Sequence, residues 1–142
     1  FSSNDFAKYH PGGALGKKLF LRVEDLVQHE KPQVKLSSSV QDVIIEISSK
    51  RLGATVVLDG DIISGLITDG DLRRMLEKGA DINYLIASDI MTENPKCISK
   101  NALAAEALGV MEVNQISQLV VDDEGTYIGI IHLHDILKEG IL

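Results

Sequence analysis

Thr68 and Asp71 are the two residues of this chain whose types and spacing most clearly suggest chemistry. They lie three positions apart, between an apolar stretch at 65–67 and a charged one at 72–74. A carboxylate can bind both hydroxyls of a ribose, and a hydroxyl beside a helix N-terminus can bind a phosphate. The same pair also matches a capping box, in which each side chain accepts a backbone N–H of the helix start. We interpret Thr68 and Asp71 as ligand-binding residues, with the capping box as the alternative.

A second stretch with a related order of residue types contains His132, His134 and Asp135. Because His132 stands where the first stretch has Thr68, we expect the capping box to be broken here. An acid that is kept without its capping partner favours ligand binding, so we include Asp135. At strand spacing the two histidine rings point to one side. A metal site is conceivable, but neither a Cys nor a third His lies nearby in sequence, so we predict an anion pocket and no metal.

The net charge of −7 means that an anionic ligand must find a local cluster of cations. The pairs at 73–74 and 50–51 are by default solvated helix faces, and they are also the best candidates to meet a phosphate or a carboxylate. We assign Arg74 to the ligand site. The same net charge argues against binding to nucleic acid or to an anionic membrane surface.

Composition places the chain among ordinary globular proteins, because 44% of its 142 residues are hydrophobic. Cys97 is the only cysteine, so an internal disulfide is excluded and a cytoplasmic location is expected. No apolar run reaches the length of a membrane span, and no signal peptide is visible. Because the chain opens with Phe1, we expect it to be a fragment.

The elements around these residues occur twice. The junction of strand and helix returns 64 positions later, from Asp71 to Asp135. The preceding helix, in contrast, matches its copy at an offset of 63, with Val40 over Leu103. We therefore expect the second hairpin turn to be one residue longer than the first. The apolar spacing predicts helices over 40–50, 72–78 and 103–113, and strands over 55–58 and 62–67.

The chain thus contains two units of about 60 residues, each with the element order βαββα. Each unit has the pattern Gly-apolar-apolar-x-x-x-Asp at its second strand–helix junction. These features resemble a CBS-domain pair, or Bateman module. The resemblance covers residues 23–142. It implies an α+β fold of two units, at 23–80 and 87–142, packed pseudo-symmetrically around a shared core. It also implies a regulatory role, with an adenosine-type nucleotide or related ligand bound in the cleft between the units.

Residues 5–17, DFAKYHPGGALGK, are similar to the end of the sugar-isomerase (SIS) domain in arabinose 5-phosphate isomerases. TDGDLRR at 68–74 and HLHD at 132–135 also resemble that family's CBS motifs. The resemblance implies that residues 1–22 are the tail of an isomerase domain and a linker. The parent would interconvert ribulose 5-phosphate and arabinose 5-phosphate, at the head of Kdo and lipopolysaccharide synthesis. His10 would be its catalytic base; with its partners in the missing domain, we expect this chain alone to be inactive.

Four functions are compatible with the sequence. The leading one is a regulatory module that requires no cofactor and binds CMP-Kdo or another nucleotide. The second is a free-standing adenine-nucleotide sensor, against which His132 and the segment around His10 argue. The third is a structural dimerisation module with empty clefts. The fourth is an enzyme using Asp69 and Asp71, which lack a base, a nucleophile or a metal partner.

CMP-Kdo suits the residue types because it carries ribose hydroxyls, one phosphate and a sugar carboxylate. Asp71 or Asp135 could bind the ribose and Thr68 the phosphate. The carboxylate needs a cation, which His132, His134 or Arg74 could provide.

We also expect self-association, as a dimer for this chain and as a tetramer for the parent. The helix predicted over 103–113 is apolar around much of its circumference, so one face is expected to meet a partner. Its apolar residues, with the one before it, include Ala102, Ala104, Ala105, Ala107 and Leu108.

Overall fold

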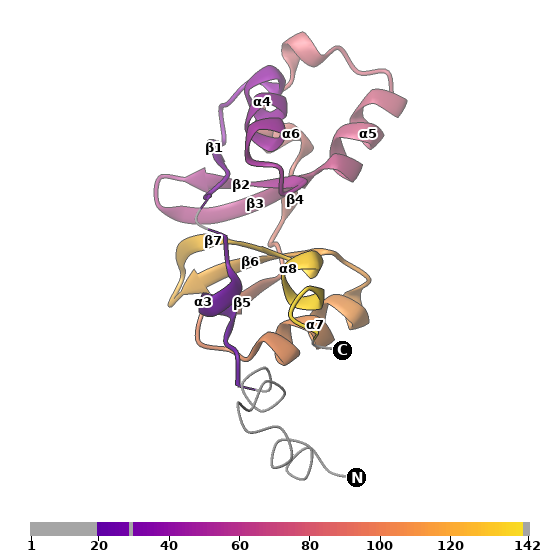
Figure 1. Ribbon diagram of the computed structural model, residues 1–142. Helices are drawn as coiled ribbons and strands as arrows, with labels where there is room; N and C mark the ends of the chain where they lie inside the picture. The colour runs from indigo at the N-terminus through magenta and orange to yellow at the C-terminus, as the bar shows by residue number, and fades with distance from the viewer. Residues whose placement is uncertain (1–19, 29, 141–142) are drawn as a thin grey trace, which may run out of the picture.

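The computed structural model describes residues 20–28 and 30–140, and it forms two halves stacked on one another (Figure 1). His10 and residues 1–19 of the expected isomerase tail lie outside this range. Within it, no helix is both long and apolar enough to cross a membrane.

Each half contains a three-stranded arrangement with two main helices. The first half consists of β1 (Gln33–Lys35), α4 (Val40–Lys50), β2 (Ala54–Asp59), β3 (Ile62–Thr68) and α5 (Asp69–Glu77). The second consists of β5 (Cys97–Ser99), α7 (Ala104–Asn114), β6 (Gln118–Asp123), β7 (Thr126–His132) and α8 (Leu133–Leu137). The short elements are α3 (Val23–Leu26), the 3₁₀ turn η1 (Ile82–Tyr84), α6 (Ala87–Ile90) and β4 (Thr92–Glu93).

Helix starts follow local capping chemistry. α4 has the predicted bounds, because the Ser39 hydroxyl accepts the Asp42 N–H at 3.1 Å and the apolar positions Val40, Val43 and Ile47 face inward. α5 begins at Asp69, three residues earlier than predicted, because Thr68 caps it.

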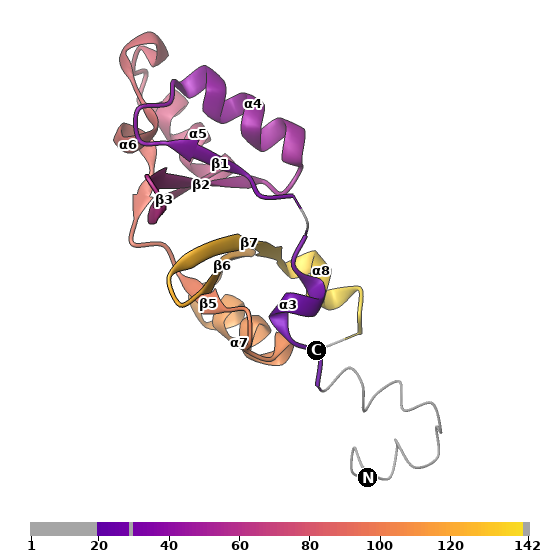
Figure 2. The ribbon, with the colours of Figure 1, turned by 90° about the vertical axis from the view of Figure 1, so that its left-hand side faces the viewer.

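The strands form one connected seven-stranded sheet in the order β1-β2-β3-β7-β6-β5, with β4 on β3. Among residues 20–28 and 30–140, one strand pair joins the two halves of the sheet, Ile62 with Thr126, and the two halves face each other (Figure 2). Figure 2 shows the helices on the outer sides. One core lies under α4 and α6, and another under α7, α8 and α3. A third, between the two halves, includes Val56, Val120 and Ile130. The predicted α+β pair with a shared core is confirmed.

The repeat has one offset throughout. α4 and α7 start 64 positions apart, at Val40 and Ala104, and the three paired strands of each half also differ by 64. The expectation of a 63-residue offset and a longer second hairpin turn is therefore wrong. Leu103 is the N-cap of α7 and corresponds to Ser39, the N-cap of α4. The apolar pattern of α7 did not reveal this shift because the helix is apolar on several sides.

The short helices α3 and α6 are exchanged between the halves (Figure 1). In α3, the Val23 N–H donates to Ala102 O at 2.8 Å, and the Val23 side chain lies in the second-half core. In α6, Ala87 makes the equivalent bond to Ser38 O at 2.8 Å and lies in the first-half core. Each half therefore receives its first short helix from the other sequence repeat, which ties the chain before β1 to the second half.

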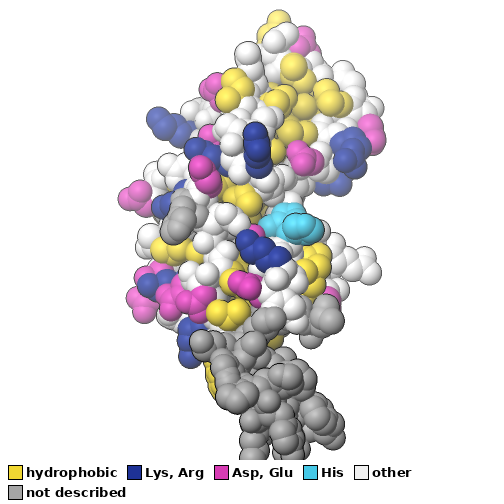
Figure 3. All heavy atoms as spheres, in the orientation of Figure 1, with side chains coloured by type: hydrophobic (Ala, Val, Ile, Leu, Met, Phe, Trp, Pro, Cys, Tyr) yellow, Lys and Arg dark blue, Asp and Glu magenta, His cyan; other side chains and the backbone are white. Residues whose placement is uncertain are grey.

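The apolar helix α7 is used mainly for its own core. Ala104, Ala107 and Leu108 are buried, whereas Ala105 is exposed. Val113, near the end of α7, is 83% exposed. Other large exposed hydrophobic side chains lie on the first half, where Figure 3 shows a hydrophobic area on the upper part of the molecule. They include Ile45, Leu76 and Tyr84.

Candidate functional site

Asp71 lies in the first turn of α5 with its side chain buried and its hydrogen bonds filled. It accepts from the Thr68 N–H at 2.9 Å, from Arg74 Nη2 at 2.6 Å and from the Thr92 hydroxyl at 3.3 Å. The Thr68 hydroxyl also lies 3.2 Å from Asp71 Oδ2 and accepts the Asp71 N–H at 3.3 Å. The capping box is therefore formed, and Thr68, Asp71 and Arg74 form one network.

Asp135 occupies the equivalent place in α8, and it is also buried. It accepts from the His132 N–H at 2.9 Å and from Gln28 Nε2 at 2.6 Å, and Lys138 Nζ lies 3.9 Å away. The expectation of a broken capping box is wrong, because His132 Nδ1 accepts the His134 N–H at 3.0 Å. An imidazole nitrogen thus replaces the threonine hydroxyl as the cap, and the retention of Asp135 has a structural reason.

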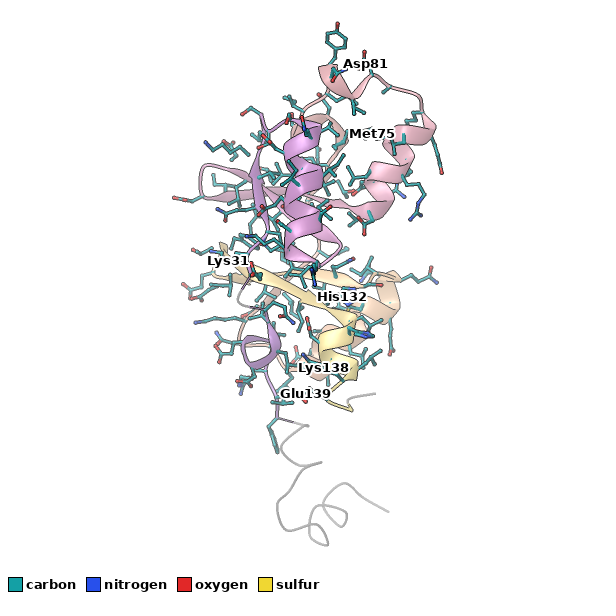
Figure 4. All side chains as sticks on the ribbon, turned by 45° about the horizontal axis from the view of Figure 1, so that its top comes forward. Lys31, Met75, Asp81, His132, Lys138 and Glu139 are labelled. Atoms are coloured by element: carbon teal, nitrogen blue, oxygen red, sulfur yellow. The ribbon has the colours of Figure 1, made fainter. Side chains whose placement is uncertain are left out.

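A pocket of about 320 Å³ lies beside Asp135, where the two halves meet. His132 and His134 line it from the second half, with ring centroids 6.1 Å apart. Lys50 and Arg51 line it from the end of α4 in the first half. Figure 4 places His132 below the end of α4, and Figure 3 shows the histidine side chains in a hollow between the halves. We call this the Asp135 pocket; it is also lined by Gln28 and Leu52.

Five of the six predicted ligand-binding residues line one of two cavities, and Thr68, which contacts Asp71, lines neither. His132, His134 and Asp135 line the Asp135 pocket. Asp71 and Arg74 line a different cavity of about 320 Å³ between α5 and α6, whose wall also contains Met75 and Met91. A ligand in one pocket therefore does not contact all six.

Sequence reasoning missed Gln28 and Thr92, which bind the two buried carboxylates. They lie 64 positions apart, and each follows one of the exchanged short helices. The repeat offset was the signal that could have paired them. Gln28 is 107 positions from Asp135, so only the tertiary structure brings the two together.

Tyr127 of the second half contacts the two residues that precede β1. Its hydroxyl donates to Pro32 O at 2.7 Å, and Lys31 Nζ lies 5.2 Å from its ring centroid. Burial, and to a smaller extent the Glu46 carboxylate, raise the pKa of Tyr127. Within residues 20–28 and 30–140, no group of three or more His, Cys, Asp and Glu side chains is arranged to hold a metal ion.

The model of the CBS domain matches this sequence twice, at residues 23–78 and 87–141. The chain belongs to the CBS domain family. The two matches and the doubled fold confirm the CBS pair expected from the repeat.

Curated relatives match over the whole chain. Arabinose 5-phosphate isomerase KdsD of Escherichia coli (strain K12) is 41% identical over 145 residues, which are 100% of this chain and 44% of that protein. KdsD of Pseudomonas aeruginosa (strain PAO1) is 44% identical over 146 residues, covering 100% and 45%. This CBS pair thus spans less than half the length of the relatives that it matches.

Solved structures support the fold. An uncharacterized conserved protein from Pyrococcus horikoshii superposes with a TM-score of 0.76 at 26% identity, over 86% of this chain and 93% of that one. The CBS domain protein PAE2072 from Pyrobaculum aerophilum, complexed with AMP, superposes with a TM-score of 0.75 at 19% identity, over 84% and 97%.

Proposed function

We propose that this CBS pair is the regulatory module of an arabinose 5-phosphate isomerase and senses a nucleotide-type ligand in the Asp135 pocket. The observation that carries the proposal is the pocket itself, in which a buried carboxylate lies beside two histidines and two cations from the other half. A volume of about 320 Å³ is at the lower end for small-molecule sites. The identity to KdsD supports the parent enzyme, and the AMP complex of PAE2072 supports the ligand class.

Within this proposal each group has a separate role. Asp135 has hydrogen-bond capacity left for ribose hydroxyls, because a carboxylate has about four acceptor positions. His132 and His134, with Lys50 and Arg51, surround the space that anionic groups of the ligand would occupy. Thr68, Asp71 and Arg74 occupy the equivalent place in the first half, and in this proposal they do not contact the ligand.

The ligand that we favour is CMP-Kdo. It combines ribose hydroxyls with a phosphate and a sugar carboxylate, so it presents two anionic groups to the cations of the pocket. AMP presents only its phosphate. Regulation by CMP-Kdo would also place the sensor on the enzyme that begins the pathway to that molecule.

A thermal-shift comparison of CMP-Kdo, CMP and AMP tests this proposal. CMP-Kdo at a hundredfold excess over its Kd should add about 2.7 kcal/mol to the free energy of unfolding. The variant Asp135→Asn should lose this shift, and the matched control Asp71→Asn should keep it. Stabilisation by AMP but not by CMP-Kdo would instead favour an adenine-nucleotide sensor. No shift with any of the three would favour a structural dimerisation module.

The parent activity and its assembly are part of the proposal. The chain alone should not turn over arabinose 5-phosphate, because His10 is the only residue of the expected catalytic set that it contains. Exposed Ile45, Leu76 and Tyr84 favour self-association through the first half. Sedimentation should show a dimer at tens of micromolar, a concentration on the order of weak-dimer affinities.

A further inference from the structure

The two halves carry different residue types at positions that the repeat offset makes equivalent. With the offset of 64, Lys50 and Arg51 at the end of α4 correspond to Asn114 and Gln115 at the end of α7. Arg51 and Gln115 both adopt the left-handed conformation at the helix C-cap, with φ of 60° and 53°. The correspondence is therefore structural, and the two cations that line the Asp135 pocket correspond to two neutral side chains at the end of α7.

The two carboxylates also differ in how far they are occupied. Asp71 accepts hydrogen bonds from four groups: the Thr68 N–H and hydroxyl, the Arg74 guanidinium and the Thr92 hydroxyl. Within residues 20–28 and 30–140, Asp135 accepts from two groups, the His132 N–H and the Gln28 amide. Its cation, Lys138, is 3.9 Å away, whereas Arg74 is 2.6 Å from Asp71. Groups of the same chain pair the charge of the Asp71 carboxylate and occupy its acceptor positions. Within the described residues, the Asp135 carboxylate is not paired and occupied to the same extent.

Lys50 and Arg51 are available to an anion at modest cost. Lys50 is paired with Glu30 at 3.4 Å, but the Glu30 side chain is 61% exposed, so that pair is weak and readily exchanged. Arg51 is exposed. The three cations Lys50, Arg51 and Lys138 exceed the two carboxylates Asp135 and Glu30 by one, which leaves the pocket positive in an otherwise acidic chain.

We propose that each chain has a single anion site, in the Asp135 pocket, and that Lys50 and Arg51 make it selective for a ligand with two separated anionic groups. The assumption that the ligand contains a nucleotide comes from the proposed function; the anion site itself does not depend on it. Such a ligand would join α4 of the first half to His132 and Asp135 of the second.

The test is isothermal titration of the chain with CMP-Kdo, CMP and, as an anion without a nucleoside, inorganic pyrophosphate. The double variant Lys50→Asn/Arg51→Gln copies the residue types of the other half. The control Arg73→Gln/Lys96→Asn removes the same charge from exposed positions that line neither the Asp135 pocket nor the cavity beside Asp71. We expect one CMP-Kdo per chain, and a loss of affinity of at least about tenfold in the pocket variant, the usual scale for a lost charged contact. The control should stay within about twofold, as exposed charges contribute little.

The outcomes separate the two proposals. Two ligands per chain, or an equal CMP-Kdo affinity in the wild type and the Lys50→Asn/Arg51→Gln variant, would overturn the single charged site. Either result would leave nucleotide sensing intact. Binding of pyrophosphate that depends on Lys50 and Arg51, with no nucleotide bound, would support the anion site and overturn nucleotide sensing. Absence of binding by all three probes would overturn both.

Discussion

Replacing Tyr127 with phenylalanine removes one buried hydroxyl from β7, the strand that ends at His132 in the Asp135 pocket. Tyr127 is 3% exposed, and its hydroxyl donates to Pro32 O at 2.7 Å. The same carbonyl also accepts the Val56 N–H at 3.2 Å, so it keeps one partner in the variant. The expected cost is therefore that of one net hydrogen bond, about 1 kcal/mol, and not that of an unpaired buried carbonyl.

Urea and thermal unfolding at pH 7 measure this cost, and about 1 kcal/mol should lower Tm by roughly 4 °C. Tyr84→Phe is the matched control, because Tyr84 is 84% exposed and should change the free energy of unfolding by less than about 0.5 kcal/mol. A loss above about 3 kcal/mol, or no loss at all, would refute the assignment of one redundant hydrogen bond at Pro32.

The pH dependence gives a second readout of the same residue. Burial and the Glu46 carboxylate raise the pKa of Tyr127, so above about pH 10 the unfolded chain ionises this residue and the folded chain does not. The wild type should then lose up to about 1.4 kcal/mol per pH unit that Tyr127→Phe does not lose. Parallel stability curves for the two proteins between neutral and alkaline pH would contradict the raised pKa.

Further predictions concern packing and reactivity. Gly65→Ala should destabilise the fold by about 1–3 kcal/mol in urea unfolding, because its Cβ would lie within 3.0 Å of Met91; an unchanged midpoint would show that Met91 moves freely. Gly109→Ala should instead stabilise it by up to about 1 kcal/mol, since the site lies in α7 with open space around it; a loss would show an unrecognised contact. Cys97 should react with iodoacetamide at pH 8 more slowly than a cysteine in a short peptide, because burial and then Asp122 raise its pKa. An equal or faster rate would be inconsistent with that shift.

The fold was largely predictable because its signals are local. The apolar spacing, with Val40, Val43 and Ile47 on one face, predicted the bounds of α4 to the residue. The error in register arose at Leu103, which continues the apolar run of α7 but serves as its N-cap. Leu103 makes no side-chain capping hydrogen bond, and its backbone pairs with Arg22 as that of Ser39 pairs with Ile86.

The candidate site was predictable in its residue types and not in its grouping. The histidines and both buried acids stood out from their spacing, but spacing could not show that His132 caps α8 through Nδ1. Nor could it show that Gln28 reaches Asp135, because the exchange of α3 between the halves creates that contact. The first contact is local, between residues two positions apart, whereas the second depends on tertiary packing.

The most direct test of the site is a backbone amide NMR titration of this chain with CMP-Kdo. We predict saturable shift changes at Gln28, at Arg51 and across residues 132–135, with residues 68–71 unaffected. Changes confined to residues 68–71, with none around Asp135, would contradict the placement of the ligand in the Asp135 pocket.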